Sequence, residues 1–134
     1  MAGETSLATL LRSMSPQLND GEYVFCSITD PSLLRDCEVL GSFREHEGLT
    51  VILRREQAER LGLGFDYVAA WITLQVHSAL QAVGLTAAFA GALGRAGISC
   101  NVIAGYYHDH LFVGLADAEK AVQVLQRLAA GEEL

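Results

Sequence analysis

The sequence predicts an α+β protein in which helices pack on one face of an antiparallel β-sheet. Three observations lead to this fold class. Short apolar runs of strand length alternate with segments whose apolar residues recur at helical spacing. From residue 67 onward the expected order of elements is strand, helix, strand, strand, helix, which is the order of a split β-α-β unit. The length of 134 residues suits one domain, or two very small ones that share a core.

The first half of the chain is expected to contain a smaller set of elements. Ser6 precedes apolar residues at positions 7, 10, 11 and 14, which predicts a short amphipathic helix. Pro16 and the Asn19-Asp20-Gly21 turn then end it, and no strand is expected before residue 22. The later elements are a buried strand over 22–28, a hairpin with arms at 42–47 and 49–53, and a short helix over 55–61. The polar first arm indicates an edge or pocket-facing strand. Residues 32–40 fit a helical turn and an irregular strand equally well.

The second half begins with the longest apolar run, residues 67–76, with Trp71 in its middle. Such a run predicts a central strand covered on both faces. The elements expected after it are a loop over 81–84, a helix over 86–96, a strand over 99–105, a turn over 107–110, a strand over 111–115 and a helix from Asp117. One face of the helix at 86–96 carries the small residues Ala87, Gly91 and Gly94, which permits close packing against another helix or chain.

A ferredoxin-like sheet needs a fourth strand, and the chain after Asp117 ends too soon to supply it. The first half looks like a degenerate copy of the same unit. We therefore expect two ferredoxin-like βαββαβ units, over residues 1–64 and 65–134. They are expected to lend strands to each other and to pack as one globule.

Composition and charge exclude several classes of partner. Hydrophobic residues make up 51% of the chain and charged residues 19%, which indicates a packed globule rather than a disordered chain. The net charge is −7, and the only adjacent basic residues are Arg54 and Arg55. Without a positive stripe, neither nucleic acid nor an anionic membrane surface is an expected partner.

The cysteines and the terminal sequence indicate a cytoplasmic protein. Cys26, Cys37 and Cys100 form neither a C-x-x-C motif nor a metal-ligand pattern, so we expect buried, reduced thiols. The N-terminal residues lack the basic and apolar regions of a signal peptide. No apolar run has the length needed to span a bilayer.

The histidines do not assemble into a recognisable catalytic or metal-binding pattern. In an extended chain, His108 and His110 point to one side and Asp109 to the other, so the three are expected in a solvated turn rather than around zinc. His77 and Ser78 could pair as base and nucleophile, but the sequence shows neither an orienting group nor an oxyanion hole. We therefore expect no catalytic residues, no bound metal and no cofactor.

Several motifs resemble those of the ACT domain family, the small regulatory βαββαβ modules of amino-acid metabolism. The segments that carry the resemblance are residues 82–87 (AVGLTA) and 93–102 (LGRAGISCNV), which look like the aspartokinase regulatory pattern of a loop glycine, a helix and Gly-Ile-x-x-Asn. Residues 72–78 (ITLQVHS), 101–113 (NVIAGYYHDHLFV) and the hairpin over 43–53 are similar to small bacterial proteins of uncharacterised function with two ACT units.

The resemblance implies an effector site rather than an active site. In the ACT family, effector amino acids lie at an interface between units, held by the loop before the first helix and by the segment after it. Carried over to this sequence, the resemblance implies the ligand-binding residues Val83, Gly84, Leu85, Thr86, Ile98 and Asn101. It also implies a homodimer or a higher homo-oligomer.

The loop over 82–86 has a physical case of its own. A helix N-terminus leaves backbone N–H groups unpaired and carries partial positive charge, so it stabilises a carboxylate. Gly84 would let a ligand approach the backbone closely. In the alternative interpretation, Gly84 only turns the chain and Thr86 caps the helix.

The sequence thus predicts a non-catalytic regulatory module that binds a small ligand, in particular an amino acid, between ACT units. The alternative hypothesis is a structural or protein-interaction module that has lost its ligand. In that case the small helix face with Gly91 and Gly94 would be the docking surface.

Overall fold

The computed structural model describes residues 6–76, 79–132 and 134 of the chain. It consists of two compact units. Unit 1 is formed by Met1–Asn19 together with Ala70–Leu134, and unit 2 by Asp20–Ala69. Strand β5 (Val68–Gln75) begins in unit 2 and continues into unit 1.

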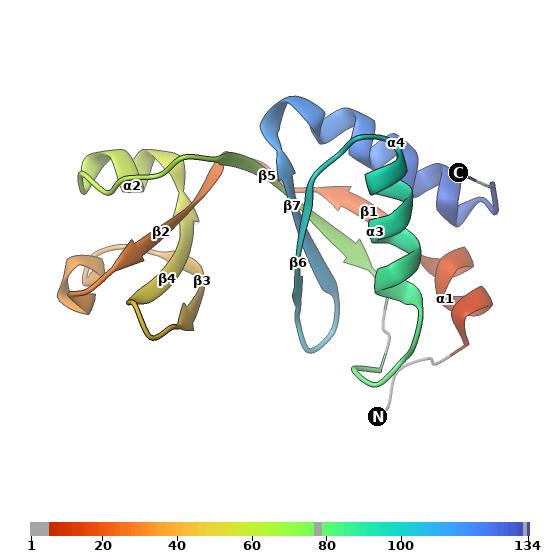
Figure 1. Cartoon of the computed structure of the whole chain (residues 1–134), viewed down its shortest axis with the longest axis horizontal. Helices are drawn as coiled ribbons and strands as arrows, with labels where there is room; N and C mark the ends of the chain where they lie inside the picture. The colour runs from red at the N-terminus through yellow and green to blue at the C-terminus, as the bar shows by residue number, and fades with distance from the viewer. Residues whose placement is uncertain (1–5, 77–78, 133) are drawn as a thin grey trace. The chain divides into compact units, whose positions relative to one another are not determined.

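Unit 1 is an antiparallel sheet with helices on one face (Figure 1). Its elements are α1 (Leu7–Ser13), β1 (Ser15–Leu18), β5, α3 (Leu85–Arg95), β6 (Cys100–Ala104), β7 (Asp109–Gly114), η2 (Leu115–Asp117) and α4 (Ala118–Ala129). The strand order is β1-β5-β7-β6. In β5, Ile72 and Leu74 point into the core beneath the helices, and Trp71 and Thr73 alternate with them on the opposite face. The largest buried side chain of this core is Phe89 of α3.

Strand β1 was not expected from the sequence, although the end of the first helix before Pro16 is confirmed, because α1 ends at Ser13. Residues Ser15–Leu18 pair with Ile72–Gln75 of β5. Proline is tolerated here because β1 is an edge strand, where one side of the backbone has no ladder partner. β1 is the fourth strand that the β5-α3-β6-β7-α4 order lacks.

Unit 2 has the same arrangement on a smaller scale. Its elements are β2 (Tyr23–Ile28), η1 (Pro31–Leu34), β3 (Val39–Arg44), β4 (Leu49–Arg54), α2 (Arg55–Arg60) and the first residues of β5. The strand order is β3-β4-β2-β5, with Val24 of β2 opposite Val68 of β5. The unit 2 core lies between these strands and α2, around Val51, Leu53 and Ala58.

Most of the elements expected from the sequence are confirmed, as is the fold class: ferredoxin-like antiparallel sheets with helices on one face. The hairpin around Gly48 is present, and its first arm is an edge strand. Residues 32–40, left open by the sequence, form the end of η1 and the start of β3. The turn expected over 107–110 is wrong, because β7 already begins at Asp109.

Candidate ligand-binding site

The N-terminus of α3 presents backbone amides, as the sequence predicts. Gly84 is the N-cap residue and has φ 100° and ψ −21°, a left-handed conformation that glycine adopts without a steric penalty. The first intrahelical bond runs from the Ala88 amide to the Gly84 carbonyl at 2.9 Å. The amides of Leu85, Thr86 and Ala87 therefore have no acceptor within the helix. Thr86 does not cap the helix, because the N-cap position belongs to Gly84.

The space beside the α-carbon of Gly84 is occupied by a side chain of unit 1. A Cβ placed on Gly84 would lie 3.1 Å from Cδ2 of Leu7, a residue of α1. The left-handed backbone favours glycine here, and a Cβ would also require the end of the Leu7 side chain to shift slightly. A ligand would have to approach the amides from the first turn of α3, where the side chain of Thr86 is exposed.

The six residues implied by the family resemblance fall into two groups. Val83, Gly84, Leu85 and Thr86 lie at the beginning of α3, whereas Ile98 follows its end and Asn101 lies in β6. An α-helix rises about 1.5 Å per residue, so the 11 residues of α3 separate the groups by about 16 Å. Figure 1 shows the start of β6 at the opposite end of unit 1 from the loop before α3. One copy of unit 1 does not bring the two groups together.

Burial further limits which atoms of these residues a ligand could reach. The side chains of Leu85 and Ile98 are each 3% exposed and belong to the unit 1 core. The Ile98 amide donates to the Leu93 carbonyl at 2.9 Å, closing the C-terminal turn of α3. Of the second group, the exposed side-chain amide of Asn101 is therefore the accessible polar group.

Four exposed apolar side chains lie at the end of unit 1 where α3 begins, and we call them the loop-end patch: Leu80, Val83, Tyr106 and Tyr107. Their exposed fractions range from 62% for Tyr107 to 83% for Val83. Figure 1 shows the loop before α3 and the β6–β7 turn at the same end of unit 1. His108 Nδ1 lies 3.5 Å from the Val76 carbonyl, next to this turn. Such a patch is typical of an interaction surface.

His110, the last residue of the expected histidine turn, is part of a polar network that the sequence did not predict. His110 lies in β7 and not in a solvated turn. Its Nδ1 accepts a hydrogen bond from Trp71 Nε1 at 3.1 Å and lies 3.2 Å from Thr73 Oγ1. Asn19 Nδ2 donates to Thr73 Oγ1 at 2.9 Å. The alternation of Trp71 and Thr73 in β5 is the signal that places both on the face opposite the helices.

The network fixes the protonation state of His110. An indole N–H only donates, so Nδ1 is the acceptor and the proton of the neutral ring is on Nε2. Burial lowers the pKa of His110 below its ordinary value, the nearby His108 adds to the decrease, and Asp109 opposes it. Burial raises the pKa of the Asp109 carboxyl, and the two histidines oppose that shift.

The structure describes the remaining candidate residues only in part. Within residues 6–76, 79–132 and 134, no three His, Cys, Asp or Glu side chains are grouped to hold a metal ion. His77 and Ser78 lie outside the described residues. All three cysteines are free thiols, as expected, but only Cys26 is fully buried, whereas Cys37 and Cys100 are half-buried.

Comparison with known proteins identifies the family. Two models of the ACT domain match the chain, one over residues 2–70 and the other over residues 67–127. The chain belongs to the ACT domain family. ACT domains are regulatory modules that typically bind small ligands and form oligomers. The division of this chain into ACT units at residue 64 stays a prediction.

Solved structures with the same fold include a protein of unknown function from Vibrio cholerae, described as a possible transport protein. It is 51% identical, with a TM-score of 0.85, over 93% of this chain and 97% of its own. The ligand-free regulatory subunit of aspartate kinase from Thermus thermophilus is 9% identical, with a TM-score of 0.63, over 87% of this chain and 98% of its own.

E. coli aspartokinase III, in complex with aspartate and ADP, is 15% identical over 92% of this chain and 34% of its own, with a TM-score of 0.63. At identities this low, the likeness to the two kinase structures shows a shared fold and nothing more. The search of the curated proteins found no significant match. In the part of the chain that the structure describes, no helix has both the length and the apolar character needed to cross a membrane.

Proposed function

We propose that this ACT protein is a regulatory module that binds an amino acid at an interface between two copies of the chain. The observation that carries the proposal is the beginning of α3. There, amides without an intrahelical acceptor lie at the same end of unit 1 as the loop-end patch, in which Val83 is 83% exposed. Polar donors next to an uncovered apolar surface are typical of a site that a second molecule completes.

The separation of the expected residues supports a site shared between copies. The loop before α3 and Asn101 lie at opposite ends of α3, so one copy cannot offer both to one small ligand. In a two-fold dimer with antiparallel α3 helices, the beginning of one helix meets the end of the other. The loop of one copy would then face Asn101 of its partner.

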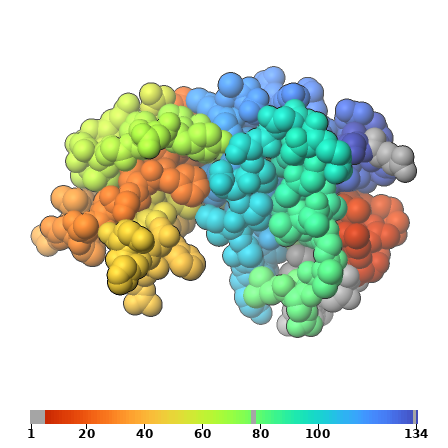
Figure 2. Space-filling model, in the orientation of Figure 1, coloured from red at the N-terminus to blue at the C-terminus, as the bar shows by residue number. Residues whose placement is uncertain are grey.

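The small face of α3 suits such a helix pair. Ala87 and Gly94 are exposed, and a Cβ placed on Gly94 would meet no atom within 4 Å. Figure 2 shows the outer side of α3, in teal and green, uncovered by the other elements of unit 1. Small residues allow two helix backbones to approach closely, as the sequence predicted.

The chemistry of the two groups matches the two ends of an amino acid. The α-carboxylate would accept hydrogen bonds from the amides of Leu85 and Thr86, where the helix dipole stabilises negative charge. The α-ammonium group would donate to the Asn101 side-chain oxygen of the other copy. A ligand that touches both copies favours the dimer, so binding and assembly are coupled.

The test is calorimetric titration with the twenty amino acids, together with sedimentation equilibrium with and without the ligand that gives heat. We expect at least one amino acid to bind and to shift the equilibrium toward the dimer. Thr86→Glu should abolish binding by repelling the carboxylate, yet leave the fold intact, because an acidic residue is favourable in the first turn of a helix. Thr86→Gln is the neutral control of nearly equal size and should still bind.

The alternative is an interaction module that has lost its ligand, with the small face of α3 as its docking surface. The exposure of Gly94 favours this candidate as well. Silent titrations of the folded protein, combined with self-association that Gly94→Phe disrupts, would support it and contradict ligand binding. Heat that Thr86→Glu removes and Thr86→Gln retains would exclude it.

A further inference from the structure

Unit 2 contains a pocket that is separate from the beginning of α3. Its volume is about 280 Å³, and its walls are the segment 32–37 and one side of α2. The α2 wall is formed by Gln57, Arg60 and Leu61, which share one helix face because they are three and four positions apart. One wall is thus η1, which is only 4 residues long and has no buried residue, with the residues that follow it, and the other wall is α2.

Two cationic side chains line the pocket, although the protein is acidic. The chain has 9 Lys and Arg residues and a net charge of −7, yet Arg35 and Arg60 both line this pocket, together with the carboxylate of Asp36. Elsewhere, Arg55 and Arg127 are paired with glutamates at 3.0 Å. Within the described part of the chain, neither Arg35 nor Arg60 forms an ion pair.

A thiol lies in the same wall. Cys37 is half-buried, packs against the unit 2 core, and donates a hydrogen bond from Sγ to Oε1 of Gln57. This bond ties the segment 32–37 to α2 and keeps the thiol at the pocket. The rate at which Cys37 reacts with an alkylating reagent therefore reports on a molecule bound in the pocket.

We propose that this pocket binds a small organic or inorganic anion, a carboxylate or a phosphate, through the guanidinium groups of Arg35 and Arg60. Guanidinium groups bind both classes through paired N–H donors. The volume lies just below the range of about 300–1,000 Å³ typical of ligand pockets, so the occupant is a small anion rather than a nucleotide. Asp36 reduces the positive charge of the site, which favours a ligand of low net charge.

The first test uses the charge of two alkylating reagents. Iodoacetate and iodoacetamide both attach to the thiolate with loss of iodide, and they differ in charge. The ratio of their rates at Cys37 therefore reports the local attraction for an anion and cancels any change in the thiol pKa. We expect Arg35→Gln combined with Arg60→Gln to lower the iodoacetate-to-iodoacetamide ratio at least about fivefold. Peptide mass spectrometry separates Cys37 from the other thiols.

The control variant removes the same charge elsewhere. Arg12→Gln combined with Arg44→Gln deletes two exposed cations that do not line the pocket, and it should leave the Cys37 ratio unchanged. Within each sample, Cys26 and Cys100 serve as slow references, because Cys26 is 4% exposed and burial raises the pKa of Cys100 to about 11. An equal decrease in the control variant would mean that net charge, not the pocket, sets the rate, and would overturn the proposal.

A second test uses the unmodified protein. Succinate and inorganic phosphate are added separately at constant ionic strength, and the rate of Cys37 alkylation by iodoacetamide is followed. Saturable protection by succinate supports a carboxylate ligand, and protection by phosphate supports a phosphate ligand. If neither anion protects Cys37 and the double variant keeps the wild-type ratio, the pocket does not bind anions.

Discussion

The two units of this ACT protein differ most in the segment that follows the first strand of each. In unit 1, β5 leads to α3, which has 11 residues and four buried side chains. In unit 2, β2 leads to η1, which has 4 residues and none buried. After this segment, two strands and a helix follow in both units, whereas the fourth strand precedes the others in unit 1 and follows them in unit 2. The longer segment packs four side chains into its core, whereas the shorter one packs none and lines the pocket beside α2.

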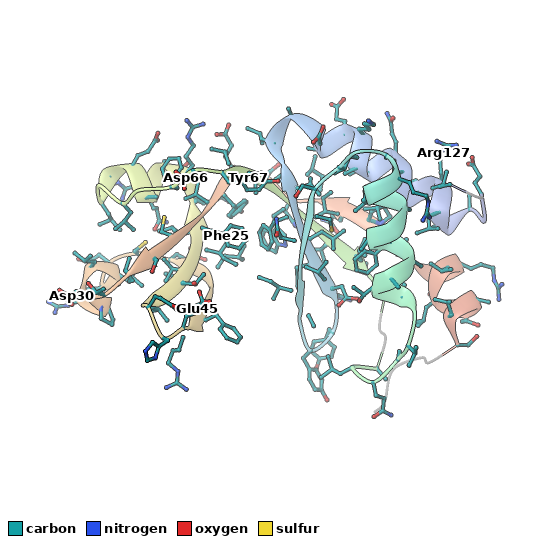
Figure 3. All side chains as sticks on the ribbon, in the orientation of Figure 1. Phe25, Asp30, Glu45, Asp66, Tyr67 and Arg127 are labelled. Carbon is teal, nitrogen blue, oxygen red and sulfur yellow. The ribbon has the colours of Figure 1, made fainter. Side chains whose placement is uncertain are left out.

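The capping of the two segments differs in the same way. α3 begins at a left-handed glycine, and its first amides stay without intrahelical acceptors. η1 begins at Asp30, labelled in Figure 3, whose side chain accepts hydrogen bonds from the Ser32 amide at 3.0 Å and the Ser32 hydroxyl at 2.7 Å. The first amides of α3 thus have no side-chain cap, whereas an amide of the short η1 is capped by the Asp30 side chain.

The largest expected effect comes from deleting the same side chain in both segments. Leu93 of α3 is fully buried, whereas Leu33 of η1 is 44% exposed. Leu93→Ala should lower the free energy of unfolding by about 2–5 kcal/mol, because it removes apolar contacts and leaves a cavity. Leu33→Ala should change it by no more than about 0.5 kcal/mol. Urea unfolding measures both, and equal losses would mean that η1 contributes to its core as much as α3 does.

A second pair compares two glycines within unit 1. Gly84→Ala places a Cβ in a left-handed conformation and 3.1 Å from Leu7, and should destabilise the protein by about 1–2 kcal/mol. Gly94→Ala adds a methyl group in open space inside a helix and should stabilise it by up to about 1 kcal/mol. Thermal unfolding should show a lower melting temperature for Gly84→Ala and a higher one for Gly94→Ala. A neutral Gly84→Ala variant would show that the loop adapts and that its backbone is not fixed by Leu7.

Acid should weaken unit 1 through His110. Its pKa is lowered in the folded protein, mainly by burial, whereas the unfolded chain titrates near the ordinary value of about 6.5. The unfolded state therefore binds the proton first. The contribution of His110 to stability is complete above about pH 6.5 and is lost as the pH falls through the lower folded pKa. Protonation of Nδ1 also removes the acceptor for Trp71 Nε1.

Fluorescence of Trp71, the only tryptophan, measures this titration. We expect its emission to change as the pH falls below about 6.5, because the folded pKa of His110 is lowered, and the change to disappear in His110→Gln. Other groups near the ring are His108, in the turn before β7, and Asp109. Because the pKa of Asp109 is raised in the folded protein, its protonation favours the folded state, opposite to that of His110, and does so at lower pH. His46→Gln, an exposed change in unit 2, should keep the wild-type profile. A profile that His110→Gln leaves intact would assign the titration to another group.

The sequence was sufficient for elements whose pattern is local. Apolar spacing located α1, α3 and α4, and Gly48 located the β3–β4 hairpin. Strand β1 could not be found this way, because its evidence is its partner in β5 and its proline reads as a breaker. His110 was expected in solvent for a similar reason: its acceptor role depends on Trp71 and Thr73, which are more than thirty positions away in the chain.

The two candidate sites also differ in whether a local sequence pattern reveals them. The glycine before α3 is visible in the sequence, since a strand, a glycine and an amphipathic helix follow one another. The pocket of unit 2 is lined by Arg35, which follows η1, and by Arg60 of α2. No spacing rule links these arginines, so the structure was needed to find them.

The smallest expected effect concerns Asp30, because its carboxylate is fully exposed. Hydrogen bonds from the Ser32 hydroxyl and amide lower the pKa of Asp30. Asp30→Ala should slightly lower the melting temperature, since η1 loses its cap, and should speed the reaction of Cys37 with iodoacetamide, since the segment 32–37 becomes looser. Asp30→Asn keeps an acceptor at the cap and should match the wild type in both measurements.

The comparison of Asp30→Asn with Asp30→Ala separates the cap from a general charge effect. Because the folded pKa of Asp30 is lowered, its contribution is present above the ordinary value of 3.8 and is lost as the pH falls through the folded value. Cys37 reactivity at neutral pH thus reports an intact cap in the wild type and in Asp30→Asn, but not in Asp30→Ala. If Asp30→Asn were as reactive as Asp30→Ala, the charge of Asp30, rather than its hydrogen bonds to Ser32, would hold η1 beside the pocket.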